Sequence, residues 1–134
     1  MKFAYYYRHK TTKDVKRYIF GIEEIEYLDR YFDDLKMAFS SFADFDKYLM
    51  NEGYELIERA RCTGFKDVSK TDIFEGDIIR HFARELGVVT FQDECVGVRW
   101  SNDDFRIGVP FEVHKVIGNI YQHATLLTRG DVKP

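Results

Sequence analysis

The chain has 134 residues, of which 45% are hydrophobic and 16% aromatic, and its net charge is −3 at neutral pH. This composition supports one packed domain and excludes general disorder. No stretch approaches the ~20 apolar residues of a membrane span, and charges near the start argue against a secretory signal peptide. We therefore expect a cytoplasmic protein, in which Cys62 and Cys95 form neither a disulfide framework nor a metal-type pair.

The charges divide along the chain. Residues 1–17 contain six basic residues and one acidic residue, for a net charge of +5. Residues 23–58 contain eleven acidic and three basic residues, for a net charge of −8. These segments either steer a partner or compensate each other within the fold, and we favour internal compensation.

The N-terminal residues predict a hairpin followed by a helix. A polar loop over residues 8–14 separates two stretches with strand periodicity. Each strand places alternate apolar or aromatic residues on one face: Phe3, Tyr5 and Tyr7, then Tyr18, Phe20 and Ile22. Residues 24–42 fit both helical spacing and strand alternation, so their conformation stays open. Ser41 as N-cap, Asp44 in the first turn and Gly53 at the end predict a short amphipathic helix over 41–51.

Short strands with turn residues about every ten positions occupy the C-terminal half. A strand over 54–62 leads into a turn at Thr63-Gly64. The later strands are expected at 73–82 with an interruption at Gly76-Asp77, 86–91, 95–100, 105–111, and 116–121 with a bulge at Gly118. This pattern favours a small SH3-like antiparallel barrel, because closure protects strand edges. Its expected inward-facing residues are Val96, Val98, Ile107, Val109 and Ile120.

The predicted fold class is therefore mainly β with a minor helical part (α+β). Within a single domain over 1–134, we expect the hairpin and helix in 1–62, the barrel in 63–127 and a tail in 128–134.

Residues that carry enzyme chemistry do not form a recognisable set. Glu75-Gly76-Asp77 is either a turn or a pair of carboxylates able to bind a cation, and we favour the turn. The histidines show no metal-ligand spacing: His9, His81, His114 and His123. Neither cysteine has a base that the sequence places beside it, and nucleotide-binding and hydrolase motifs are absent. We predict a protein that is not an enzyme and has no cofactor or metal.

Four motifs in the second half occur in a characteristic order. They are Gly64-Phe65-Lys66-Asp67, Ile73-Phe74-Glu75-Gly76-Asp77-Ile78, Gly87-Val88-Val89-Thr90-Phe91 and Val116-Ile117-Gly118-Asn119-Ile120-Tyr121. Over residues 63–127 the chain resembles the YopX family of bacteriophages and prophages of Gram-positive bacteria, whose molecular function is not established. The resemblance implies an accessory protein in the cytoplasm of a bacterial host. Two features depart from the family pattern: Val68-Ser69 replace an Asn-Gly turn, and the acidic, aromatic segment 23–51 matches no motif.

Two hypotheses for function follow. The first is a protein-interaction module that binds a host or phage protein, or a second copy of itself. Phe, Tyr and Trp total 22 residues, more than a small interior readily buries, and exposed aromatics mark contacts. The candidate contact residues are Tyr27, Tyr31, Phe32, Phe42 and Phe45.

The alternative is single-stranded nucleic-acid binding by the basic hairpin. Arg8, Lys10 and Lys13 are the candidate phosphate contacts, and the run of tyrosines at 5–7 is expected to stack on bases. A sequence pI of about 5.8 weighs against this hypothesis, so we favour protein interaction.

Overall fold

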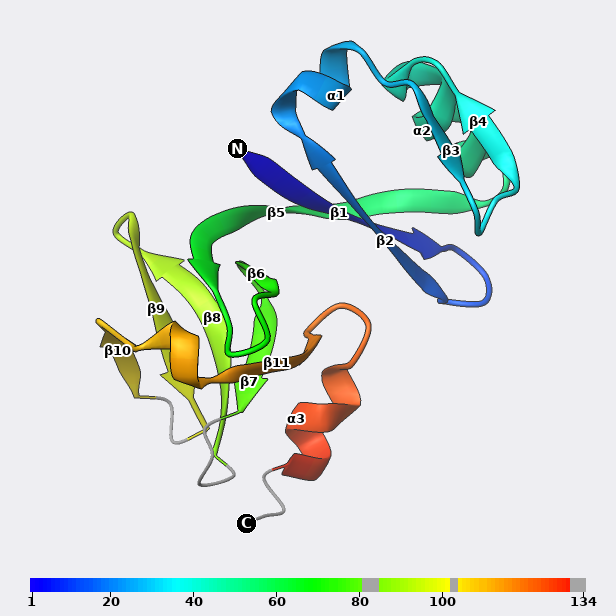
Figure 1. The fold of residues 1–134 in the computed structure, drawn as a ribbon. Coiled ribbons are helices and arrows are strands. Elements are labelled where there is room, and N and C mark those ends of the chain that lie inside the picture. Colours follow the sequence, from blue (N-terminus) through cyan, green and yellow to red (C-terminus); the bar gives the residue numbers. More distant parts are fainter. Residues whose placement is uncertain (81–84, 102–103, 131–134) are drawn as a thin grey trace. The chain divides into compact units, whose positions relative to one another are not determined.

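The alternating aromatic residues at the N-terminus form the predicted hairpin. In the computed structural model, which describes residues 1–80, 85–101 and 104–130, strand β1 (Lys2–His9) pairs antiparallel with β2 (Val15–Gly21). Tyr5 lies directly opposite Tyr18. The long strand β5 (Tyr54–Lys66) lies on the other side of β1 (Figure 1).

The chain divides into two compact units, Met1–Arg59 and Ala60–Pro134. The predicted division between the helical part and the C-terminal part lies three residues beyond this boundary. Strand β5 begins in the first unit and ends in the second.

The ambiguous region 24–42 is a short helix followed by a small hairpin. Helix α1 (Ile22–Glu26) precedes the antiparallel strands β3 (Arg30–Phe32) and β4 (Met37–Phe39). The apolar residues of region 24–42 recur at helical spacing because they face one core. Leu28 and Phe32 are buried in this core, and four partly buried residues pack against it: Ile25, Leu35, Phe39 and Phe42. The helical spacing of these residues therefore reflects their burial in one core and not a continuous helix.

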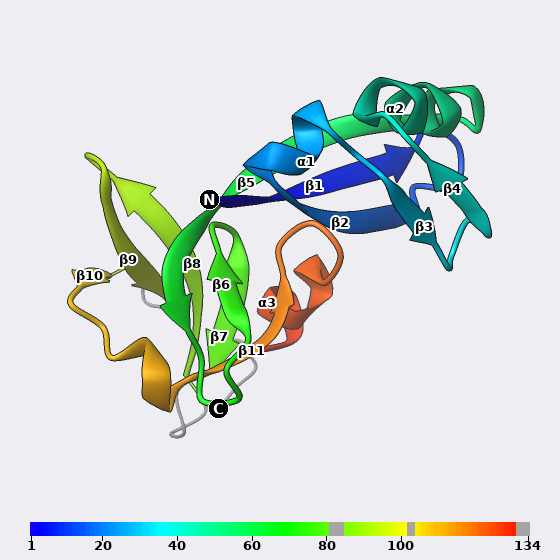
Figure 2. The same ribbon diagram turned by 45° about the horizontal axis from the view of Figure 1, so that its top comes forward.

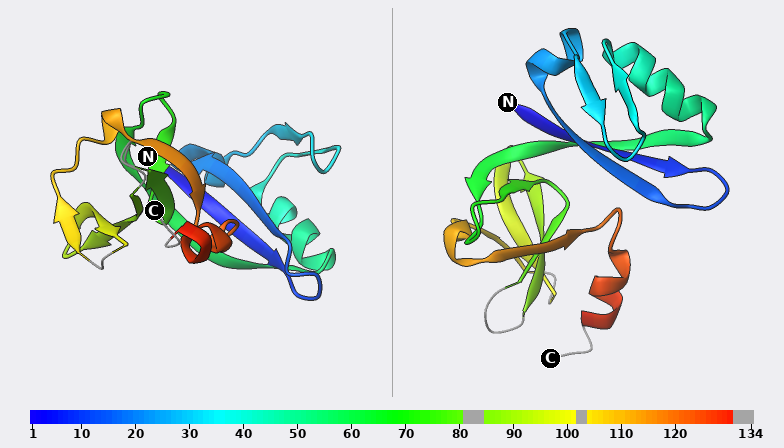
Figure 3. Two further views of the ribbon diagram at one scale, coloured as in Figure 1. Left: turned by 90° about the horizontal axis from the view of Figure 1, so that it is seen from below. Right: turned by 45° about the vertical axis from the view of Figure 1, so that its right-hand side comes forward.

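Helix α2 (Phe42–Asn51) begins and ends as predicted. The hydroxyl of Ser41 accepts the backbone N–H of Asp44 at 3.1 Å, which satisfies one free donor of the first turn. Gly53 follows the helix with a φ of +93°, a conformation that glycine adopts without strain. Figures 2 and 3 show α2 and the β3–β4 hairpin on one side of the β2-β1-β5 sheet.

Aromatic rings fill the core of the first unit. The ring of Phe45 lies 4.7 Å from that of Phe32 and 5.0 Å from that of Tyr18, measured between centroids. At the margin of this core, the Tyr7 hydroxyl donates to Asp46 at 2.9 Å and the Tyr18 hydroxyl to Asp34 at 2.5 Å. Burial raises the pKa of both tyrosines well above the usual range, and the facing carboxylates raise it further.

The second unit contains an open five-stranded antiparallel sheet in the order β10-β9-β8-β7-β11. Strand β5 continues through the expected turn at Thr63-Gly64, because Gly64 adopts a φ of +87° and the strand bulges there. The remaining elements are β6 (Asp72–Phe74), β7 (Asp77–Arg80), β8 (Leu86–Gln92), β9 (Cys95–Trp100), β10 (Phe105–Ile107), the 3₁₀ helix η1 (Phe111–Val113), β11 (Lys115–Asn119) and α3 (Ala124–Gly130).

The predicted barrel is wrong, although the mainly β class is confirmed. Strand β10 ends after three residues, because Gly108 adopts a φ of +71° and Pro110 has no N–H to donate. The chain then crosses to the far edge and pairs as β11 with β7, so β10 and β11 remain separate edges (Figure 1).

The inward-facing residues of this sheet were predicted with one clear error. Val98 is fully buried, and Val96 and Val109 pack against the same core, whereas Ile120 is half-buried. Ile107 is 61% exposed. The register explains the error: Val98 pairs with Arg106, so Ile107 lies opposite Gly97 on the other face of the sheet.

Candidate functional site

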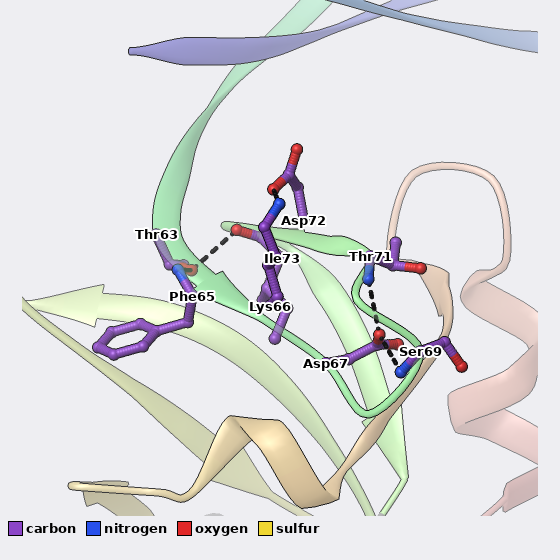
Figure 4. Close-up of polar contacts among 8 residues, drawn as sticks. All are labelled: Thr63, Phe65, Lys66, Asp67, Ser69, Thr71, Asp72 and Ile73. Carbon is purple, nitrogen blue, oxygen red and sulfur yellow. Dashed lines mark hydrogen bonds and ion pairs between the residues drawn. The ribbon is translucent and has the colours of Figure 1, made fainter.

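The carboxylate of Asp67 organises the loop between β5 and β6. One oxygen accepts the backbone N–H groups of Ser69 at 2.8 Å and Thr71 at 2.9 Å (Figure 4). The other oxygen accepts the backbone N–H of Val116 at 2.9 Å. Burial opposes ionisation, yet these three donors and the nearby ammonium of Lys115 hold the Asp67 pKa below its usual range. Asp67 therefore joins the loop to β11 and is occupied by backbone groups.

Side chains on either side of this loop tie β5 to β6. The hydroxyl of Thr63 donates to the backbone oxygen of Ile73 at 2.9 Å, and the ammonium of Lys66 lies 2.6 Å from Asp72. Figure 4 shows Phe65 pointing away from these contacts. The first family motif thus supplies hydrogen bonds that shape a hairpin.

Asp77 and Asn119, which belong to two other motifs, also accept backbone N–H groups in turns. Asp77 is buried and accepts the backbone N–H of Phe74 at 2.8 Å, which closes the turn at Gly76. Glu75 instead pairs with Arg61 at 3.3 Å. The two carboxylates of this motif therefore have different partners, and the turn interpretation is confirmed. The side-chain oxygen of Asn119 accepts the backbone N–H groups of Tyr121 at 3.0 Å and Gln122 at 2.8 Å.

The opposite charges of the first unit meet in ion pairs. Basic side chains of the hairpin and of β3 contact acidic side chains in the pairs Arg8–Glu55 at 3.7 Å, Lys16–Asp34 at 3.6 Å and Arg30–Glu24 at 3.2 Å. Ion pairs within the first unit, the interpretation that we favoured, therefore neutralise part of the negative charge of residues 23–58.

The acidic residues near β3 lie on an exposed surface with two tyrosines. Along residues 27–33 burial alternates strictly after the end of α1: Leu28 and Phe32 are buried, and the odd-numbered positions are exposed. Tyr27 is 81% and Tyr31 57% exposed. We call the four exposed residues of this stretch the tyrosine face: Tyr27, Asp29, Tyr31 and Asp33.

The five predicted partner contacts separate into two groups. Tyr27 and Tyr31 lie on the surface. Phe32 and Phe45 are buried in the core, so their side chains are not accessible to a partner, and Phe42 is half-buried against the same core. The prediction treated the segment as a whole, whereas its phenylalanines pack in or against the core and Tyr27 and Tyr31 lie on the surface. The alternation of apolar and polar residues through Leu28 and Phe32, if recognised, would have found Asp29 and Asp33.

The basic hairpin offers less to nucleic acid than the sequence predicted. Lys10 and Lys13 are exposed in its loop, but Arg8 is half-buried and paired with Glu55. All three tyrosines at positions 5–7 are buried, so they are not available to stack on bases.

A cavity of about 570 Å³ lies beside β10 in the second unit and was not predicted. Its apolar wall consists of Trp100, Ile107, Val109, Pro110 and Val113. The polar groups at its rim contact their own neighbours: Arg106 pairs with Asp104 at 2.6 Å, and the ring nitrogen Nδ1 of His114 lies 2.8 Å from a backbone oxygen.

Within residues 1–80, 85–101 and 104–130, no three His, Cys, Asp or Glu side chains are grouped as metal ligands would be. Cys62 and Cys95 are free thiols. His81 and the turn residues at 102–103 lie outside the described residues, as does the end of the predicted tail. In the part of the chain that the structure describes, no helix is long and apolar enough to cross a membrane.

Comparison with known proteins extends the resemblance into the first unit. The family model described as YopX protein matches residues 8–128, which include the acidic segment as well as the four motifs. A search of curated proteins found no match.

Proposed function

The chain belongs to the YopX family, and on that premise we propose that it is a phage or prophage accessory protein that acts as a non-catalytic interaction module. The proposal assigns it to the cytoplasm of the bacterial host. Its binding surface is the tyrosine face.

One observation carries this proposal. In a segment whose phenylalanines are buried or half-buried, Tyr27 and Tyr31 are the aromatic side chains most exposed to solvent. Tyr31 lies opposite the exposed Ala38 in the β3–β4 hairpin, so a small side chain leaves the ring accessible. Accessible tyrosines are enriched in protein interfaces, because they add a large contact area at a low cost in conformational entropy.

The family motifs support a role without catalysis. The polar residues that distinguish them are occupied by backbone hydrogen bonds in turns, as Asp67, Asp77 and Asn119 illustrate. A carboxylate held in this way is not positioned to transfer a proton to a substrate.

The test is site-specific photo-crosslinking in host cells. A photoreactive phenylalanine analogue replaces Tyr31, and in a control protein it replaces Met50, which lies on α2 and is exposed to the same degree. We expect a discrete crosslinked protein from position 31 that is absent from position 50, with both variants folded by circular dichroism. Equal crosslinking at the two positions, or none at position 31, would refute the proposal.

A further inference from the structure

The tyrosine face consists of tyrosines and aspartates that alternate along the sequence, and all four are exposed. Tyr31 is the middle residue of β3, Asp29 directly precedes that strand, and Asp33 directly follows it at the start of the turn toward β4. Tyr27 precedes them at the end of α1. The face therefore combines exposed aromatic rings with negative charges.

The carboxylates of Asp29 and Asp33 are available to pair with a partner's positive charges. Two acidic residues nearby are compensated within the unit, Glu24 by Arg30 and Asp34 by Lys16. Among the residues described, neither Asp29 nor Asp33 has an ion-pair partner. The local potential at the face is therefore negative, and it attracts positively charged groups.

The chain itself shows how such a combination holds arginine. On the inner side of the same strand, the guanidinium of Arg30 lies 4.6 Å from the ring centroid of Phe32 and 3.2 Å from Glu24. A cation over an aromatic ring is attracted by the negative face of the ring, and a carboxylate beside it adds a charged hydrogen bond.

We propose that the tyrosine face binds an arginine-rich segment of a partner protein, with guanidinium groups over the tyrosine rings and against the flanking carboxylates. This inference rests on the proposed function and specifies the chemistry of the partner. Because the charges are exposed, salt weakens the interaction.

The probe is a fluorescein-labelled peptide of alternating arginine and threonine, compared with a glutamate–threonine peptide, by fluorescence anisotropy at low salt. We expect the arginine peptide alone to bind. The affinity for the arginine peptide should fall about fivefold in D29N/D33N and about tenfold in Y27S/Y31S, whereas Y27F/Y31F should retain it. The control variant E52Q/E58Q removes the same net charge elsewhere in the first unit.

Each other outcome overturns the inference. If E52Q/E58Q loses as much affinity as D29N/D33N, only the net charge matters. If the arginine peptide shows no saturable binding, the tyrosine face does not recognise arginine. A lower mass of D29N/D33N than of the wild type in light scattering means that a second copy of the chain occupies the face. If the photo-crosslink from position 31 persists in these cases, the interaction module stands and only its partner's chemistry is wrong.

Discussion

Replacing Asp67 by asparagine tests how the second unit is held together. The side chain is only 2% exposed, and its two oxygens accept three backbone N–H groups. Asparagine keeps one acceptor oxygen, which can still serve Ser69 and Thr71, but its amide NH₂ then faces the N–H of Val116. Two donors cannot bond each other, so a buried N–H loses its partner.

The magnitude follows from these contacts. An unsatisfied buried donor costs about 1–3 kcal/mol, and hydrogen bonds to a charged acceptor exceed neutral ones by roughly 1 kcal/mol each. We expect D67N to lower the free energy of unfolding by about 3–4 kcal/mol at neutral pH. The chain's single tryptophan, Trp100, lies in this unit, so its fluorescence during urea denaturation measures the loss directly. Ser69→Ala is the control, because it keeps the backbone N–H and should cost less than about 0.5 kcal/mol.

The pH dependence supplies a second criterion. The folded-state pKa of Asp67 lies below the unfolded value of about 3.9, so its stabilisation is complete above that value and is lost as the pH falls through the folded-state pKa. The difference between wild type and D67N should therefore shrink in acid. A D67N protein within about 0.5 kcal/mol of wild type at neutral pH, or a difference that does not change with pH, would refute the assigned role.

Three further predictions concern single positions in both units. Gly76 has a φ of +91°, and a Cβ there would lie 2.8 Å from the ring of Tyr121, so Gly76→Ala should cost about 1–3 kcal/mol by the same fluorescence assay; an unchanged midpoint would contradict this. Glu94 has a φ of +66° in the β8–β9 turn, so Glu94→Gly should raise the urea midpoint by the equivalent of about 1 kcal/mol, and a lower midpoint would count against it. Tyr7 and Tyr18 have raised pKa values, so their stabilisation is present below the unfolded value of about 10 and is lost as the pH rises above it. Tyrosinate absorbance should show them ionising only when the first unit unfolds, and Tyr18→Phe should reduce the alkaline loss; ionisation of every tyrosine with the fold intact would disprove it.

Local signals in the sequence were sufficient for most of the elements. The hairpin, the capped helix α2 and the bulge near Gly118 depend on neighbouring residues, and each lies where it was predicted. The barrel failed because closure depends on where the chain travels after β10, and a three-residue strand followed by Gly108 and Pro110 carries little information about that path.

The candidate site was predictable only in part, for a related reason. The composition indicated surplus aromatic residues, but it did not show which rings the core would bury. Phe32 and Tyr31 are neighbours in the sequence and differ in exposure because they point to opposite faces of β3. Assigning them required knowing that residues 30–32 form a strand, which the overlapping helical spacing concealed.

The aromatic core of the first unit also has a consequence for synthesis on the ribosome. The inner face of the β1–β2 hairpin is complete once Phe20 has been added, but Phe45 and Leu49, which cover it, belong to α2. At ~5–20 residues per second, roughly one to five seconds separate the two events. During that interval the aromatic inner face of the hairpin lacks the cover that α2 later provides. The first unit is thus most vulnerable to aggregation before its helix emerges.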